Sequence, residues 1–143
     1  MIDIIQNLIK LLSSDPLTSP QVAECLGKVL GEDKKHAPLS VKPHDKAFRE
    51  VKIMRKPNGT PTSVTLSLAE AQTVTLADLR AAFGDYNTMP RMNWQMPPRV
   101  MFQVDIPGQP YTCAIFADLQ MGQEPADSSV VTTITVRRDI RLE

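Results

Sequence analysis

The sequence predicts an α+β fold in which three helices pack on a five-stranded antiparallel sheet, in the order ααββαβββ. Hydrophobic residues recur at helical spacing in three segments, and they alternate with polar residues in five others, as half-buried strands require. Short turns join several of the predicted strands to their neighbours along the chain. This arrangement favours antiparallel hairpins over parallel strands, which need long crossover connections.

The N-terminal part of the chain, residues 1–31, is predicted to be a pair of helices. The first, over 2–12, is amphipathic, and its apolar face is formed by Ile5, Leu8, Ile9 and Leu12. A second helix is expected over 19–30, because Thr18 and Gln21 have the spacing of a capping box. The two helices are expected to turn their apolar faces toward each other or toward a larger element.

A β-hairpin is the strongest local prediction. Residues 31–48 are rich in charge and contain prolines, so we expect a connecting loop there. Apolar residues then alternate on both sides of the Asn58-Gly59 pair, which suits a two-residue type I′ turn. The alternating residues are Val51, Ile53, Val64, Leu66 and Leu68.

A third helix is predicted over 74–84. Thr75 and Asp78 form a second capping-box pattern, and Gly84 stands where a glycine commonly ends a helix. The buried face of this helix is expected to comprise Leu76, Leu79 and Phe83.

Three further alternating segments, near 100–106, 111–115 and 130–136, predict a three-strand meander. In the last of these strands, Val130 and Thr132 are placed on the same apolar face as Ile134. The opposite face of the sheet is expected to be hydrated or to act as a docking surface. Its predicted residues are Lys52, Thr65, Ser67, Gln103, Thr133 and Thr135.

Length and composition predict one domain over 1–143, with the sheet and its packed helix in 48–143. The 16 Lys and Arg residues balance the 16 Asp and Glu residues, and the pI is near 6.7, so no net positive charge attracts nucleic acid. Asp3 stands where an export signal carries positive charge. No apolar run approaches the roughly 20 residues that cross a bilayer. We therefore expect a cytoplasmic protein without membrane contact.

The residues that carry enzymatic chemistry are sparse. The histidines, His36 and His44, lie in one loop, where a site with Cys25 would require the loop to fold back. Cys25 and Cys113 have no CxxC spacing, so we expect two buried thiols rather than a disulfide. The six glycines are not clustered, which excludes a phosphate-binding loop or a dinucleotide fingerprint.

Metal and carboxylate chemistry have no specific signature either. The two histidines with Asp33 or Asp45 lack the spacing of a known metal site. Carboxyl pairs for a glycosidase-like reaction can be drawn from any acidic set of this size. Those present include Glu50, Asp78, Asp105 and Asp118. We therefore expect no enzyme activity, no metal and no cofactor.

One segment has the composition of a contact surface. The stretch DYNTMPRMNWQMPP, residues 85–98, is longer than a simple connection requires. Tyr, Trp, Met and Arg are enriched at the centres of protein interfaces. The predicted partner-binding residues are Tyr86, Arg91, Met92, Trp94, Met96 and Arg99. In the alternative interpretation, Trp94 and the methionines cover an open end of the sheet.

The function predicted by elimination is that of a non-enzymatic protein-binding module. The leading hypothesis is a bacterial immunity or inhibitor-type protein, a monomer or homodimer, that occludes a partner toxin or enzyme encoded beside it. One alternative is a small-ligand-binding or homodimeric accessory subunit, with a pocket lined by Phe83, Phe102 and Phe116. A secretion chaperone or adaptor, which would need a long exposed apolar groove, is the other.

Overall fold

The fold is described by a computed structural model that covers residues 2–30, 38–70, 73–90, 95–122 and 124–140. Within these ranges the helices are α1 (Ile2–Leu12), α2 (Ser19–Leu26) and α3 (Leu76–Phe83). The first four strands are β1 (Gly27–Val29), β2 (Leu39–Pro43), β3 (Phe48–Arg55) and β4 (Pro61–Leu68). The remaining strands are β5 (Asn87–Thr88), β6 (Arg99–Val104), β7 (Tyr111–Leu119) and β8 (Val131–Ile140).

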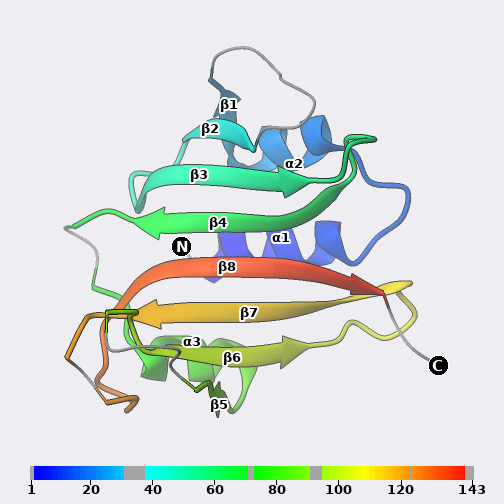
Figure 1. Ribbon diagram of the computed structural model, residues 1–143. Coiled ribbons are helices and arrows are strands. Elements are labelled where there is room, and N and C mark those ends of the chain that lie inside the picture. The colour runs from blue at the N-terminus through cyan, green and yellow to red at the C-terminus, as the bar shows by residue number, and fades with distance from the viewer. Residues whose placement is uncertain (1, 31–37, 71–72, 91–94, 123, 141–143) are drawn as a thin grey trace.

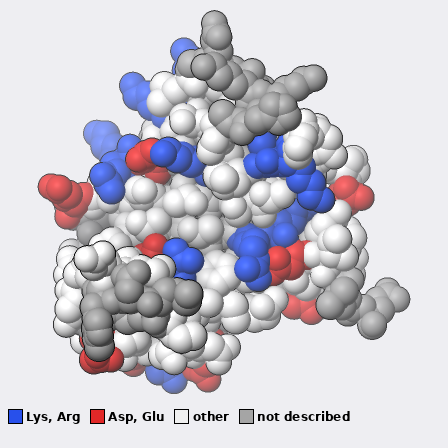
Figure 2. Space-filling model, in the orientation of Figure 1, with Lys and Arg blue, Asp and Glu red and all other residues white. Residues whose placement is uncertain are grey.

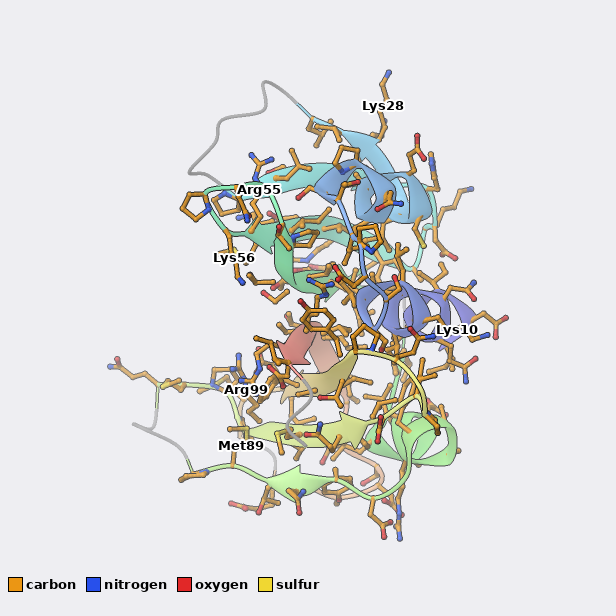
Figure 3. The ribbon with its side chains drawn as sticks, turned by 90° about the vertical axis from the view of Figure 1, so that its right-hand side faces the viewer. Lys10, Lys28, Arg55, Lys56, Met89 and Arg99 are labelled. Atoms are coloured by element: carbon orange, nitrogen blue, oxygen red, sulfur yellow. The ribbon has the colours of Figure 1, made fainter. Side chains whose placement is uncertain are left out.

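These strands form one antiparallel sheet of eight strands, in the order β1-β2-β3-β4-β8-β7-β6-β5. All three helices lie on the same face of the sheet (Figures 1 and 3), and we call this the covered face. The α+β class, the three helices and the antiparallel pairing are therefore confirmed. The predicted count of five strands is wrong, because β1, β2 and β5 lie in segments that were expected to be helix or loop.

β1 and β5 escaped prediction because two or three residues are too few to show an alternating pattern, and β2 because its five residues lie in a segment whose charge and prolines predict a loop. The helix expected over 19–30 ends at Leu26, and the chain continues as β1. Gly27 permits this close pairing, since a Cβ atom there would lie 1.9 Å from the carbonyl oxygen of Lys42. Only Leu39 and Val41 are buried in β2, and both residues of β5 are exposed.

The hairpin between β3 and β4 is confirmed, but its turn is not type I′. The Gly59 amide donates to the Lys56 carbonyl at 2.8 Å, which places Pro57 and Asn58 at the two central positions. Type I′ requires positive φ at both central residues. Of these residues only Gly59 has a positive φ, at 90°. Pro57 fixes its own φ near −65° and so selects a type I turn followed by glycine.

Both predicted capping boxes are present. The Thr18 hydroxyl accepts from the Gln21 amide at 3.4 Å, and the Gln21 side chain accepts from the Thr18 amide at 2.8 Å. Thr75 and Asp78 make the same reciprocal pair at 3.4 and 3.0 Å. These local bonds fix where α2 and α3 begin, and so which side chains each helix turns toward the sheet.

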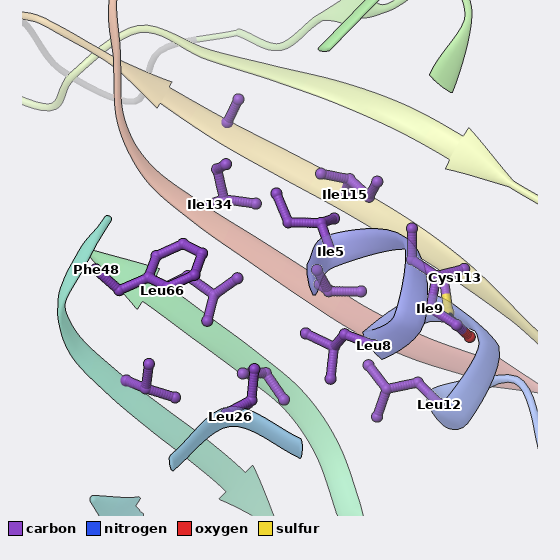
Figure 4. Packing of buried hydrophobic residues seen from close by; sticks show 14 of the residues in the cluster. Ile5, Leu8, Ile9, Leu12, Leu26, Phe48, Leu66, Cys113, Ile115 and Ile134 are labelled. Carbon is purple, nitrogen blue, oxygen red and sulfur yellow. Dashed lines mark hydrogen bonds between the residues drawn. The ribbon is translucent and has the colours of Figure 1, made fainter. Parts of the chain in front are cut away.

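The core lies between the sheet and the helices, with α1 over the middle strands (Figure 4). The four residues predicted for the apolar face of α1 are buried. They meet apolar side chains of β4, β7 and β8 such as Leu66, Ile115 and Ile134. At α3, Leu76 and Leu79 are buried as predicted, whereas Phe83 is half-buried at the margin. The core therefore extends through both halves of the sheet.

Arg138 of β8 holds the C-terminal end of α1. Its Nε atom donates to the Leu12 carbonyl at 2.8 Å, and its Nη2 atom donates to the Ser14 carbonyl at 2.7 Å. The guanidinium carbon also lies 3.5 Å from the centroid of the Tyr111 ring, and the side chain is only 4% exposed. A cation suits this place because the last carbonyls of a helix lack intrahelical donors and form the negative end of its dipole.

The predicted facing of the first residues of β8 is wrong, because the strand contains a bulge. The register with β7 shifts between Asp118 and Leu119, and Leu119 pairs with Val131. Val131 is therefore buried, Thr132 is exposed, and Val130 is only half-buried. An extra residue in one strand reverses the alternation beyond it, which a strict period of two does not anticipate.

The cysteines differ from the prediction in one respect. Both are free, and Cys113 is buried beside the Ser13 hydroxyl, as expected of a core thiol. Cys25 is exposed, because the sheet-facing positions of α2 are taken by Val22, Ala23 and Leu26.

None of the helices in the described ranges has the length and apolar character needed to cross a membrane.

Candidate functional site

The candidate site lies on the face of the sheet opposite the helices, which we call the open face. Strand pairing aligns one outward-facing residue from each of five neighbouring strands in a row across this face. The row consists of Lys52, Thr65, Thr135, Phe116 and Met101. None of the six residues predicted for the polar face is buried. The facing inferred from alternation is thus correct for the central part of the sheet.

The middle of the open face is a floor of hydroxyl side chains. They come from the adjacent strands β4 and β8, and comprise Ser63, Thr65, Ser67, Thr133 and Thr135. Thr65 and Thr135 stand directly opposite each other, with their Oγ1 atoms 3.5 Å apart. Because these side chains are short, longer charged side chains rise around them. Figure 2 shows this as a pale central area with Lys and Arg at its margins.

Phe116 of β7 lies between two arginines on this face. Arg99 is opposite Asp118, and Arg137 is opposite Ala114, so the two arginines flank Phe116 along the strand direction. The guanidinium carbon of Arg99 is 5.6 Å from the ring centroid, and that of Arg137 is 5.0 Å away. These are cation–π distances. The ring is consequently only 8% exposed, although it points away from the core.

A carboxylate fixes each of these arginines from the side. The Nε and Nη2 atoms of Arg99 donate to the two oxygens of Asp118 at 2.6 and 3.2 Å. Arg137 donates in the same way to Asp139 at 2.8 and 3.2 Å. The hydrogen bonds to Asp118 raise the pKa of Arg99 above its usual value, despite an opposing effect of burial. The paired hydrogen bonds hold both guanidinium groups in defined orientations.

The positive groups are more exposed than the negative groups. The side chain of Arg99 is 44% exposed and that of Asp118 is 16% exposed. For Arg137 and Asp139 the fractions are 51% and 31%. Among the residues that the structure describes, each carboxylate engages two of the five N–H donors of its arginine, which leaves three on each guanidinium group. A molecule approaching the open face therefore meets cationic hydrogen-bond donors before it meets the acids.

Thioether side chains border the same region. Met54 of β3, Met89 and Met96 are 43%, 37% and 42% exposed. Met89 follows β5, and its amide donates to the Arg99 carbonyl at 3.1 Å. In Figure 3, Met89 and Arg99 project on the side away from the helices, as do residues of the β3–β4 hairpin. Flexible apolar side chains of this kind adapt to irregular partner surfaces.

The partner-binding residues predicted from sequence are distributed over different environments. Arg99 is part of the arginine cluster, and Met96 is exposed. Tyr86 is half-buried, with its ring edge-on to Phe102 at 5.8 Å, and so lies at the margin of the core. The other three residues, Arg91, Met92 and Trp94, lie outside the described residues.

Sequence reasoning missed Arg137 and Asp139, and it considered Phe116 and Asp118 only in other roles, as part of a ligand pocket and as a candidate carboxylate. One signal was present, because alternation with Cys113 and Ile115 directs Phe116 to the polar face, where a large aromatic residue is unusual. The placement also overturns the pocket considered for a small ligand. Phe83 and Phe102 pack together on the covered face with ring centroids 6.4 Å apart, whereas Phe116 lies on the open face. The three rings therefore do not line one cavity.

Those groups considered for catalysis or metal binding that the structure describes have structural contacts or lie at the surface, whereas His36 and Asp33 lie outside the described residues. Glu50 pairs with Lys52 at 3.2 Å, Asp118 pairs with Arg99, and Asp78 caps α3. His44 is exposed. In the part of the chain that the structure describes, no group of three or more His, Cys, Asp or Glu residues is placed to hold a metal ion.

Comparisons with known protein families, curated proteins and solved structures give no match to this chain. The functional inference therefore rests on the chemistry of the open face. That face carries oriented cationic donors beside exposed thioether side chains.

Proposed function

We propose that the chain is a non-enzymatic protein-binding module that docks a partner protein on its open face. The observation that carries the proposal is the cluster of Arg99, Phe116 and Arg137, with each arginine held by its own carboxylate. In type, we propose a bacterial immunity or inhibitor protein whose partner is a toxin or enzyme. Inhibition is steric, because a docked sheet covers the catalytic site of the partner.

Preorganisation makes these arginines suited to binding. A free arginine loses side-chain entropy when a partner immobilises it, at a cost of about 0.5–1.5 kcal/mol. Contacts to Phe116 and the carboxylates have already restricted Arg99 and Arg137. Binding-energy hot spots are enriched in arginine, and they lie where neighbouring groups exclude water. The bordering methionines can act as such neighbours once a partner covers them.

The proposal is tested by photo-crosslinking in the source cell. Thr135 on the open face and Lys10 on α1 are each replaced by p-benzoylphenylalanine, so that the two probes report on opposite faces (Figure 3). We expect Thr135 to give one crosslinked species of defined mass, containing the product of a neighbouring gene. We expect little product from Lys10. Equal crosslinking from both positions would contradict docking on the open face.

An activity measurement then tests the inhibitor type. The partner identified by crosslinking is purified in its uncrosslinked form. Its enzymatic or toxic activity is then titrated with the wild-type chain. We expect loss of activity at a one-to-one ratio. We also expect the variant Arg99→Gln/Arg137→Gln to require at least about tenfold more protein, since hydrogen bonds to charged groups contribute about 1.5–3 kcal/mol each. A partner that is bound but fully active would retain the binding module and reject the inhibitor type.

Homodimerisation is a second candidate, favoured by the charge pattern of the open face. Lys52 with Glu50, Arg99 with Asp118, and Arg137 with Asp139 place both signs on one surface. A two-fold contact needs a surface that is complementary to itself, and such a pattern provides one. Sedimentation equilibrium separates the candidates. A dimer that dissociates in the Arg99→Gln/Arg137→Gln variant would favour the homodimer over the inhibitor.

A further inference from the structure

We propose that the segment received by the open face is an extended acidic stretch of the partner, with two carboxylates two residues apart that bind Arg99 and Arg137. This inference rests on the proposed function and gives the partner a chemical class. It follows from the spacing of the two guanidinium groups, the donors they retain and the environment of Phe116.

The separation of the two cations is compatible with an extended chain as the ligand. Both guanidinium carbons lie within 5.6 Å of the same ring centroid, so they are separated by less than twice that distance. Side chains two residues apart in a strand point to the same side and are about 6.7 Å apart. Two such carboxylates can therefore reach one guanidinium group each.

The remaining donors have the correct position for this contact. Each arginine uses its Nε and Nη2 atoms for its own carboxylate, and within the described parts of the chain its Nη1 group remains for a ligand. Asp118 and Asp139 are the less exposed members of the pairs. They therefore neutralise the cations from below without covering them. Hydroxyl groups of the adjacent floor, such as those of Thr133 and Thr135, can donate to the outer oxygens of the incoming acids.

The environment of Phe116 disfavours a nucleic acid as the occupant. Single-stranded nucleic acids bind by stacking their bases on open aromatic faces along a positive groove. Phe116 is 8% exposed and is flanked by guanidinium groups, so a base cannot stack on it. The chain has a formal net charge of zero, and three acids lie on the same face as the arginines. A long phosphate backbone would be repelled by them, whereas a short acidic peptide can be held by the arginines and the hydroxyl floor.

The probe for this inference is the peptide acetyl-Asp-Gly-Asp-amide, with acetyl-Asn-Gly-Asn-amide as its neutral control. Binding is followed by ¹⁵N NMR of the whole protein, through the Nε–Hε signals of the arginines. We expect the acidic peptide to shift the signals of Arg99 and Arg137 saturably at millimolar concentration. The neutral peptide should leave them unchanged. Because these guanidinium groups are exposed, we also expect the apparent Kd to rise at least about threefold between 0.05 and 0.5 M salt.

Arg80 serves as the matched control within the same spectrum. It is 50% exposed and pairs with Asp85 and Asp127 at 2.9 and 3.4 Å, but it belongs to α3 on the covered face. Its signal should not respond to the acidic peptide. Variants at this position and on the open face can then be compared directly. Arg80→Gln should preserve the peptide affinity, whereas Arg137→Gln should weaken it about tenfold.

At Arg99, a double variant that keeps a paired partner for residue 118 separates loss of binding from misfolding. Arg99→Gln leaves Asp118 without its partner, so we would pair it with Asp118→Asn, which replaces the ion pair by an amide pair. The double variant should keep the thermal midpoint of the wild type within a few degrees and lose peptide binding about tenfold. Retained affinity in a folded double variant would overturn the inference.

Three further results would also overturn it. These are equal shifts at Arg80, equal shifts with the neutral peptide, and tighter binding of a single-stranded oligonucleotide than of the acidic peptide. None of them rejects the proposed function. Crosslinking of a protein from Thr135 without a response to the acidic peptide would show that the open face docks a partner of different chemistry. Loss of crosslinking with a retained peptide response would reject the function instead.

Discussion

Arg137 and Arg138 are neighbours in β8 and have opposite roles, and the difference is that between the two faces of the sheet. Arg138 points into the covered face, is 4% exposed, and donates to carbonyls at the end of α1. Arg137 points to the open face, is 51% exposed, and pairs with Asp139 above the hydroxyl floor. Identical chemistry thus stabilises the fold on one side and is accessible to a partner on the other.

The comparison teaches that burial decides what a charged group contributes. Removing one partner of a buried polar contact leaves the other without a hydrogen bond, at a cost of about 1–3 kcal/mol per group. An exposed ion pair contributes about 0–1 kcal/mol, because water competes for both partners. Substitutions on the covered face should therefore change stability, whereas those on the open face should change binding.

The largest effect is expected at Ile134 compared with Thr135. Ile134 is fully buried against α1, and its replacement by Ala should lower the free energy of unfolding by about 3 kcal/mol. Thr135→Ala on the open face should lower it by no more than about 1 kcal/mol. Urea denaturation of the two variants measures both values. Equal losses would mean that the open face is as tightly packed as the covered face.

The arginine pair should show the next largest difference. Arg138→Met keeps the length of the side chain but removes the donors to Leu12 and Ser14, so we expect a loss of about 2–3 kcal/mol. Arg137→Met should cost less than about 1 kcal/mol. The same denaturation experiment tests this, with Arg138→Lys as a variant that retains the charge. An equally unstable Arg137→Met variant would show that the open-face cluster supports the fold.

A smaller effect is expected at the start of α3, which covers one half of the sheet. Thr75→Ala removes the acceptor for the Asp78 amide and should lower the free energy of unfolding by about 1 kcal/mol. Thr75→Ser retains the hydroxyl group and should restore most of it. Thermal unfolding followed by circular dichroism is adequate. A loss unchanged by serine would attribute the effect to the methyl group rather than to the cap.

The smallest effect concerns the two thiols, whose reactivity measures how well the covered face excludes solvent. Burial raises the pKa of Cys113, and a hydrogen bond with Ser13 only partly opposes this. Burial also raises the pKa of Cys25, which is nevertheless exposed. We expect a maleimide to modify Cys25 in the native protein, at a rate that increases with pH as the thiolate forms. Cys113 should react only after local unfolding exposes its thiol to solvent. Peptide mass spectrometry distinguishes the two, and Cys113 should react faster in Ile134→Ala.

The sequence was most informative where one local signal was sufficient. Threonine at each N-cap with Gln21 or Asp78 three residues later located the starts of α2 and α3 correctly. Alternation located β3, β4, β6, β7 and β8, and it placed Thr65 and Thr135 on the polar face. Such signals are reliable because the bonds or periods that they describe lie within a few residues of the chain.

Prediction failed where a residue's environment came from distant parts of the chain. β1 is a strand because Gly27 lets the backbone approach Lys42, and no pattern within 27–29 indicates this. The bulge at Thr132 depends on its pairing with β7. Among the predicted contact residues, Tyr86 lies against Phe102, while Arg99 gained its partner 19 positions away in Asp118.

By itself the sequence determined the fold class, the helix starts and the alternation that gives the sheet one apolar face and one polar face. The tertiary structure alone decided that Phe116 lies between Arg99 and Arg137. It also decided that Arg138 donates to the Leu12 carbonyl at the end of α1. The physical reason is the range of the interactions. Hydrogen bonds and side-chain periods act along the chain, whereas strand order and register determine which distant side chains meet, and the proposed binding face exists only once the register is set.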